Sequence, residues 1–222
     1  MSDIILQLRD VDKAYFLDKT PVPVLKQINF SVEDGEYVAI MGPSGSGKST
    51  MMNIIGCLDK QTAGDFIFDG VDVGKCKDRQ LSVIRNEKIG FVFQNFALIN
   101  RYTVYENLEV PLLARNQKNY KNKIMDCLER LGISEYYKSY PPFLSGGQQQ
   151  RCAIGRALLT DCELLLCDEP TGALDRDTSN EIMDVLCEAN EKGKTIVIVT
   201  HDLLVAARCK QQIHLEDGKV LI

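Results

Sequence analysis

Short, uninterrupted apolar runs recur along the chain and are its clearest pattern. Four of them predict strands that are buried on both faces, as in a parallel sheet covered by helices. These runs are Glu36–Met41, Lys88–Phe93, Glu163–Cys167 and Thr195–Thr200. The segments between them predict helices, at Lys48–Leu58, Asn122–Leu131, Gln148–Leu159 and Thr178–Asn190. Because strands and helices alternate, the pattern predicts an α/β core.

Two regions depart from this alternation. The N-terminal third has alternating apolar and polar positions with Asp-Gly turns at 34–35 and 69–70, which predict antiparallel strands, and residues 212–222 predict a hairpin of the same kind. Residues 94–161 are mostly helical and predict a subdomain inserted between two core strands. We therefore expect one domain over 1–222, with 1–93 and 162–222 forming the core and its antiparallel β subdomain.

Composition narrows the class of protein. Of the 222 residues 45% are hydrophobic and 26% charged, as in a soluble globular protein, and the net charge of -5 argues against a nucleic-acid partner. No apolar run approaches the roughly eighteen residues that cross a bilayer, and the N-terminus does not resemble a secretory signal. The eight cysteines form no C-x-x-C pair, and several lie in apolar runs, so we expect buried, reduced thiols.

The stretch GPSGSGKST fits the phosphate-binding pattern G-x-x-x-x-G-K-[ST]. It follows a predicted strand and precedes a predicted helix, which makes a chance match in a glycine-rich turn a weak alternative. Its backbone N–H groups would surround phosphate oxygens, Lys48 would reach the β and γ phosphates, and the Ser49 hydroxyl would lie near Mg²⁺. The predicted ATP-binding residues of this loop are Gly42, Pro43, Ser44, Gly45, Ser46, Gly47, Lys48, Ser49 and Thr50.

Polar residues end three of the predicted core strands. Asp168 and Glu169 follow one strand, Gln94 follows GFVF, and His201 follows IVIVT. Because the carboxyl ends of parallel strands meet at one sheet edge, these side chains should converge on the ligand. Asp168 is suited to holding Mg²⁺, and Glu169 to orienting or deprotonating the attacking water; the alternative is an acidic pair that caps a helix before Pro170. Singly, Gln94 and His201 are weak signals.

A second glycine-containing loop, FLSGGQQQR at 143–151, opens the helix predicted after it. Ser145 is a good N-cap, and Gly146-Gly147 would allow backbone N–H groups to approach a ligand. On the local pattern alone, a capped helix start without any ligand is the better explanation. The helix has a plausible core-facing set: Cys152, Ile154, Ala157 and Leu158.

Taken together, these motifs resemble the ATP-binding-cassette (ABC) ATPases over essentially the whole chain. The matching pieces, in the family's order, are GPSGSGKST, Gln94, LSGGQQQR, LLLCDEP, GALD and VTHD. The resemblance implies that two cassettes face each other head to tail, so that Ser145, Gly146, Gly147 and Gln148 act on the nucleotide of the partner. It also implies that Tyr15 stacks on adenine, that Asp175 crosses the dimer interface and that His201 contacts the γ-phosphate.

The same resemblance implies catalytic roles for Glu169, His201, Gln94 and Lys48, with Gln94 and His201 also touching the bound ATP. Ser49, Gln94 and Asp168 are the implied Mg²⁺ ligands. The pieces MNIIGCLDKQTAG and YTVYENLEVPLL resemble the cassettes of the macrolide-exporter and lipoprotein-releasing group. This implies a homodimer when ATP is bound, a separate transmembrane permease, a place at the cytoplasmic face of the membrane, and export.

Two other functions are compatible with parts of the pattern. A soluble ABC ATPase acting on DNA, ribosomes or iron–sulfur assembly would be expected to carry coiled coils or a second cassette, which 222 residues do not hold. A module that senses ATP without hydrolysis is disfavoured because Glu169 and His201 are both present. Phe96, Leu98 and Tyr102 are candidate permease contacts, and each could equally belong to the core of the helical subdomain.

Overall fold

The computed structural model describes residues 4–221, which form two sheets and the helices around them. The first sheet is antiparallel, with the strand order β2-β1-β4-β5. Its strands are β1 (Ile4–Leu17), β2 (Thr20–Glu33), β4 (Ala63–Phe68) and β5 (Val71–Asp72). The predicted antiparallel β region is therefore confirmed.

The second sheet holds all four strands predicted from apolar runs. Its order is β10-β9-β3-β8-β7-β6, and every neighbouring pair is parallel except β9 with β10. The strands are β3 (Tyr37–Met41), β6 (Ile89–Val92), β7 (Leu164–Asp168), β8 (Thr195–Val199), β9 (Gln211–Glu216) and β10 (Lys219–Leu221). All five residues of β3 and of β8 are buried, as expected where helices cover both faces.

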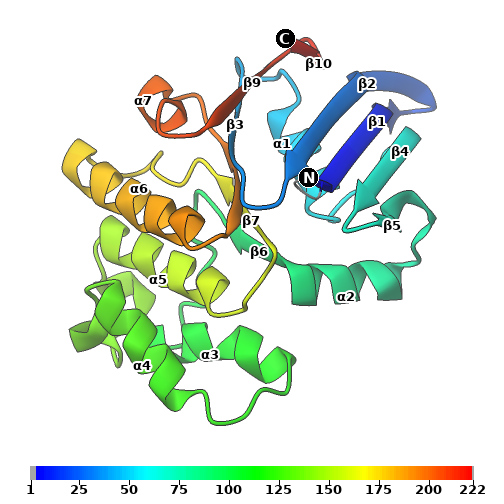
Figure 1. Ribbon diagram of the computed structural model, residues 1–222. Coiled ribbons are helices and arrows are strands. Elements are labelled where there is room, and N and C mark those ends of the chain that lie inside the picture. Colours follow the sequence, from blue (N-terminus) through cyan, green and yellow to red (C-terminus); the bar gives the residue numbers. More distant parts are fainter. Residues whose placement is uncertain (1–3, 222) are drawn as a thin grey trace.

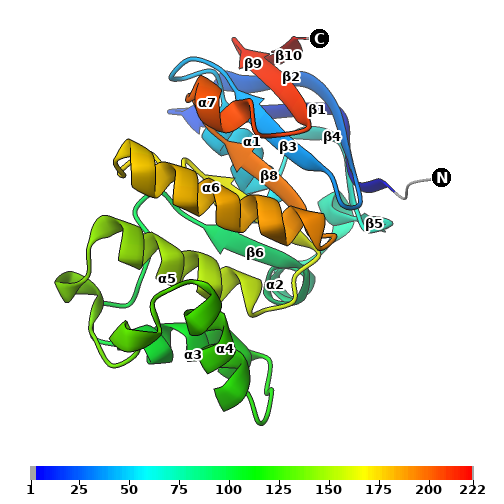
Figure 2. The same cartoon turned by 60° about the vertical axis from the view of Figure 1, so that its left-hand side comes forward.

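Seven α-helices are described, and they are unevenly distributed around the two sheets (Figures 1 and 2). They are α1 (Lys48–Ile55), α2 (Asp78–Lys88), α3 (Val104–Ala114), α4 (Lys121–Arg130), α5 (Gly146–Leu158), α6 (Arg176–Glu191) and α7 (Leu203–Ala206). Three single 3₁₀ turns lie at Val73–Lys75, Ser134–Tyr136 and Pro141–Phe143. Helices α3 and α4 lie at the end of the molecule opposite the first sheet.

Helix α5 contributes residues both to the hydrophobic core packed against the second sheet and to the core of the helical region. Ile154 and Ala157 pack with the strands of the second sheet, whereas Cys152 packs with residues of α3 and α4. Three of the four predicted core-facing residues are fully buried, and Leu158 is half-buried. A helix that is buried on two sides couples the helical region to the sheet.

Several elements differ from the sequence expectation. Helix α2 was not predicted, because only Leu81 and Ile84 of its eleven residues are buried and its apolar spacing is correspondingly weak. The predicted helix from Lys48 ends at Ile55 rather than Leu58, with Gly56 at its C-cap. The Asp-Gly turn at 34–35 does not join antiparallel partners: β2 belongs to the first sheet and β3 to the second, so the turn carries the chain between sheets.

The cysteines are as predicted, all eight being free thiols and six of them buried. Within residues 4–221 no helix combines the length and the apolar character needed to cross a membrane.

Candidate nucleotide-binding site

The loop Gly42–Thr50, here called the P-loop, connects β3 to α1 and passes close to other backbone at two of its glycines. A Cβ atom on Gly42 would lie 2.0 Å from the carbonyl oxygen of Leu215, and one on Gly47 would lie 2.7 Å from Leu25 Cδ2. Gly47 also has φ 107°, a conformation that side-chain-bearing residues rarely adopt. The loop therefore needs glycine at both positions to close against β2 and β9.

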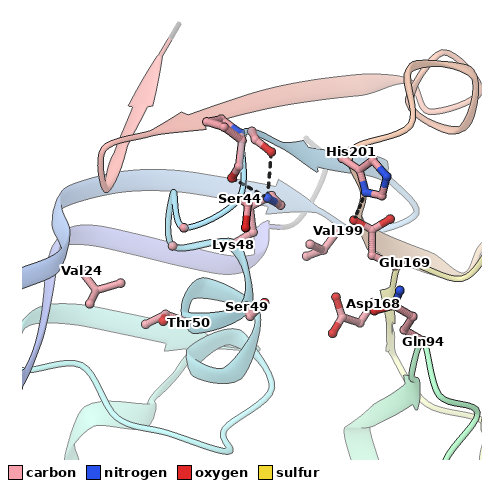
Figure 3. A pocket seen from close by; sticks show the side chains of 14 residues that line it. Val24, Ser44, Lys48, Ser49, Thr50, Gln94, Asp168, Glu169, Val199 and His201 are labelled. Atoms are coloured by element: carbon pink, nitrogen blue, oxygen red, sulfur yellow. Dashed lines mark hydrogen bonds and ion pairs between the residues drawn. The ribbon is translucent and has the colours of Figure 1, made fainter. Parts of the chain in front are cut away.

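The P-loop forms one wall of a cavity of about 700 Å³. Figure 3 shows Lys48 and Ser49 on the P-loop side and, facing them, Gln94, Asp168, Glu169 and His201. The lining residues are Val24, Gly42, Pro43, Ser44, Gly45, Gly47, Lys48, Ser49, Thr50, Gln94, Asp168, Glu169, Val199 and His201. The structure thus brings the P-loop and the polar strand ends together in one cavity.

Lys48 lies folded over its own loop. Its ammonium group donates hydrogen bonds to the carbonyl oxygens of Gly42, at 2.8 Å, and Pro43, at 2.9 Å. These bonds hold a positive charge at the N-terminal end of α1, where the helix dipole also favours an anion. A phosphate group entering the cavity would meet both features.

Asp168 and Glu169 leave β7 in different environments. Burial raises the pKa of Asp168, the neighbouring negative charge of Glu169 raises it further, and Lys48 lowers it. Glu169 has φ 44°, in the left-handed region, and its N–H donates to the carbonyl of Val199 at 2.8 Å. The sharp turn directs the two carboxylates to different sides. Neither residue caps a helix, because α6 begins at Arg176 with Asp175 as its N-cap, so the capping alternative is wrong.

His201 is paired with Glu169. Its Nδ1 lies 2.6 Å from Glu169 Oε1, and Thr200 Oγ1 donates to the other carboxylate oxygen at 3.3 Å. Both oxygens of Glu169 are therefore held in place by residues that follow β8. Three-quarters of the His201 side chain is exposed, so the imidazole lies at the open side of the cavity.

The cavity offers the oxygen ligands that Mg²⁺ uses in phosphate sites. Mg²⁺ is usually held by one or two carboxylates, waters and the substrate phosphates rather than by an all-protein cage. The Ser49 hydroxyl, the Gln94 amide and the Asp168 carboxylate all line the cavity, and a cation would offset the raised pKa of Asp168. Residues 4–221 contain no cluster of three His, Cys, Asp or Glu that could hold a metal alone.

Ser145–Gln148, here called the signature loop, begins α5 outside the residues that line this cavity in the described chain. Ser145 Oγ accepts from the N–H of Gln148, and Gln148 Oε1 accepts from the N–H of Ser145, which makes a complete capping box. Gly147 is buried against α6: a Cβ atom there would lie 2.4 Å from Thr178 Cγ2. The loop is therefore held by its own chain and set apart from its own phosphate cradle.

Two further residues singled out in the sequence, Tyr15 and Asp175, do not line the cavity. Tyr15 is 43% exposed on β1, and its hydroxyl donates to Asp59 at 2.9 Å. Asp175 accepts from the N–H of Thr178 at 3.0 Å and from its hydroxyl at 2.7 Å, and the backbone bond lowers the pKa of Asp175. Val24 and Val199 line the cavity without any sequence signal that distinguishes them from other strand residues.

A phosphate cradle between a parallel strand and a helix, with two carboxylates at the neighbouring strand end, defines a P-loop nucleotide-binding protein. The sequence also matches the family described as ABC transporter over residues 25–172. The chain belongs to this family and is an ATP-binding, ATP-hydrolysing cassette of the ABC transporter type.

Known proteins similar to this chain span nearly its whole length. An uncharacterized ABC transporter ATP-binding protein of Bacillus subtilis, YvrO, is 46% identical over 98% of this chain and 96% of its own. The macrolide export ATP-binding/permease protein MacB of Hyphomonas neptunium is 42% identical over all of this chain but only 35% of its own length. The expected similarity to macrolide-exporter cassettes is thereby confirmed.

Solved structures of the cassette MJ0796, a protein of Methanocaldococcus jannaschii, have the same fold. One is a dimer in a post-hydrolysis state with ADP and phosphate; its TM-score is 0.90 at 44% identity, over 98% of this chain and 97% of that chain. A second dimeric structure of the same protein has a TM-score of 0.91. The predicted fold class is therefore confirmed.

Proposed function

We propose that two copies of this chain pair head to tail around two ATP molecules, and that their closure and separation drive a separate membrane permease. The observation that carries this proposal is that the two glycine-containing loops, the P-loop and the signature loop, lie at separate places in one chain. The P-loop, Asp168, Glu169, Gln94 and His201 share one cavity, whereas the signature loop does not line it. The dimeric structures of MJ0796 support the pairing.

Within one copy, the position of each residue in the cavity indicates its role. The P-loop binds the phosphates, with Lys48 exchanging its bonds to Gly42 and Pro43 for bonds to phosphate oxygens. Glu169 accepts the proton of the attacking water or orients it, because both of its oxygens are already fixed near the cavity by His201 and Thr200. His201, at the exposed side, contacts the γ-phosphate.

Ser49, Gln94 and Asp168 are the residues that would hold Mg²⁺. When bound there, the ion would neutralise charge on the β and γ phosphates. The burial of Asp168 keeps this carboxylate close to the cavity, and Gln94 connects the site to the helical region that follows β6.

In the pair, Ser145 and the N–H groups of Gly146 and Gly147 would cover the γ-phosphate bound by the partner's P-loop. Tyr15 would stack on the adenine, and Asp175 would lie at the interface.

Phe96, Leu98 and Tyr102 are all half-buried, and Leu98 packs against the core of the helical region. Phe96 and Tyr102 are therefore the better permease contacts. We place the protein at the cytoplasmic face of the membrane and, from the macrolide-export relatives, infer export.

Substituting Glu169 by Gln tests the proposal. Nucleotide should stay bound while hydrolysis stops, so size-exclusion chromatography in ATP should give a stable dimer. Glu163→Gln, at the start of the same strand, makes the same charge change far from the cavity and should leave the wild-type elution unchanged. Lys48→Ala combined with Glu169→Gln should elute as a monomer. A Glu169→Gln variant that stays monomeric in ATP would contradict the paired arrangement.

A further inference from the structure

Lys13, Tyr15 and Asp59 form a closed cluster beside the nucleotide cavity. Lys13 Nζ donates to Asp59 Oδ1 at 2.7 Å and lies 4.7 Å from the centre of the Tyr15 ring. The Tyr15 hydroxyl donates to the other oxygen of Asp59 at 2.9 Å. Each member of the cluster thus contacts the other two.

The Lys13 charge is buried, the Asp59 carboxylate is half-buried, and each is paired with the other. Lys13 is 8% exposed, and its ammonium group also donates to the carbonyl oxygen of Lys60 at 2.7 Å. Burial raises the pKa of Asp59, but hydrogen bonds from Lys13, Tyr15 and the Lys60 N–H outweigh it and lower that pKa. Because a buried ammonium needs its partners, the cluster should hold one geometry.

The cluster adjoins the P-loop through strand pairing. Lys13 on β1 is paired with Leu25 on β2, and Leu25 is the residue against which Gly47 packs. The preceding residue of β2, Val24, lines the cavity. Tyr15, two residues after Lys13, is paired with Val22, so it lies on the pair of strands that borders the cavity.

Asp59 links the ring to the helix that carries the phosphate site. Lys48 begins α1, and the N–H groups of Leu58 and Asp59 both donate to the carbonyl of Asn53 in that helix. The phosphate cradle and the anchor of the ring are thus built on the two ends of one short helix. A change in the position of one end would be transmitted to the other.

We propose that Asp59 and Lys13 are positioning residues that hold the Tyr15 ring as a preset platform for the base of the nucleotide. The Lys13 ammonium lies over the ring, the hydroxyl is anchored to Asp59, and Tyr15 as a whole is still 43% exposed. The inference rests on the proposed stacking role of Tyr15 and adds that the ring is held before the ligand arrives. Preorganisation of this kind increases affinity by reducing the ordering needed on binding.

The test compares ADP with pyrophosphate, which has phosphates but no base, by calorimetric titration of the full chain. Tyr15→Phe keeps the ring and removes its anchor, so ADP should bind about threefold to fivefold more weakly, the effect of one lost hydrogen bond. Tyr15→Ala removes the platform and should weaken ADP binding about tenfold. Pyrophosphate affinity should stay at the wild-type value in both. Tyr140→Phe, at a tyrosine of equal exposure, is the control and should change neither.

Asp59→Ala completes a double-mutant cycle. Its effect on ADP affinity should be smaller in the Tyr15→Phe background than in the wild type, since the hydroxyl through which it acts is gone. Wild-type ADP affinity for Tyr15→Phe, additive effects in the cycle, or equal losses for ADP and pyrophosphate would overturn the inference. Wild-type ADP affinity for Tyr15→Ala would instead overturn the stacking role itself.

Discussion

Gly147 gives a direct test of how the signature loop is held by its own chain. Substituting alanine adds one methyl group, which would lie 2.4 Å from Thr178 Cγ2, too close for two carbon atoms. Gly147 is buried at the start of α5, so neither helix can relieve the contact by moving a flexible side chain into solvent. Thr178, for its part, is fixed by its bonds to Asp175.

The expected magnitude is a balance of two terms. Overpacking of a buried contact costs about 1–3 kcal/mol. Replacing glycine by alanine in a helix contributes up to about 1 kcal/mol in the opposite direction. With the opposing term at its full size, Gly147→Ala should lower the free energy of unfolding by up to about 2 kcal/mol. Gly146→Ala should cost less, because its added methyl would lie 3.2 Å from Leu174 Cδ2 and that leucine tip can shift.

Urea unfolding of the nucleotide-free chain, followed by circular dichroism, measures this effect. Thr178→Ser removes the clashing methyl and keeps the hydroxyl that bonds Asp175. In that background Gly147→Ala should become neutral or stabilising. If Gly147→Ala destabilises the Thr178→Ser background as much as the wild type, contact with α6 is not the reason for glycine at this position.

Two other substitutions test groups that the fold leaves in unfavourable surroundings. The Tyr37 hydroxyl is buried without a hydrogen-bond partner in the part of the chain that the structure describes, so Tyr37→Phe should raise the free energy of unfolding by about 1 kcal/mol. If urea unfolding gives a lower free energy of unfolding for Tyr37→Phe than for the wild type, the hydroxyl has a hydrogen-bond partner. The pKa of Asp168 in the folded state is raised above its ordinary value of 3.8. The folded state therefore binds the carboxyl proton more tightly than the unfolded state does, and the free energy of unfolding falls as the pH rises above 3.8. Asp168→Asn should therefore stabilise the nucleotide-free protein at about pH 7 and have little effect at about pH 4. An equal gain in stability at both pH values would contradict the origin given for the shift.

The sequence predicted the elements whose residues are buried in a regular way. The strands β3, β6, β7 and β8 are continuous apolar runs because helices cover both faces of the sheet, and such runs are visible without any partner. Helix α2 escaped prediction for the opposite reason, since nine of its eleven residues are not buried. The short helix α7, Leu203–Ala206, has too few residues to show a period.

In the site, too, contiguous motifs were predictable from the sequence, whereas contacts between residues far apart in the chain were not. The P-loop is a contiguous motif, and its glycines report a local backbone requirement, so the sequence indicated it directly. The Glu169–His201 pair joins residues 32 positions apart, and the Tyr15–Asp59 bond joins residues 44 apart. The sequence placed Glu169 and His201 at one sheet edge, but it indicated neither the bond between them nor the Tyr15–Asp59 bond, because both depend on how the strands are assembled.

The geometry at the start of α5 supports the proposal that the signature loop serves another chain. Ser145 Oγ accepts the bond from Gln148, but a hydroxyl also carries a proton, which this bond leaves available for a phosphate oxygen. The N–H groups in the first turn have no acceptor within the helix and lie at its positive end. Thr178 of α6 packs closely against Gly147 in the same loop. The first turn of α5 therefore offers donors to an anion while its own chain supports it, which favours the proposal that the loop binds the phosphate held by a second copy.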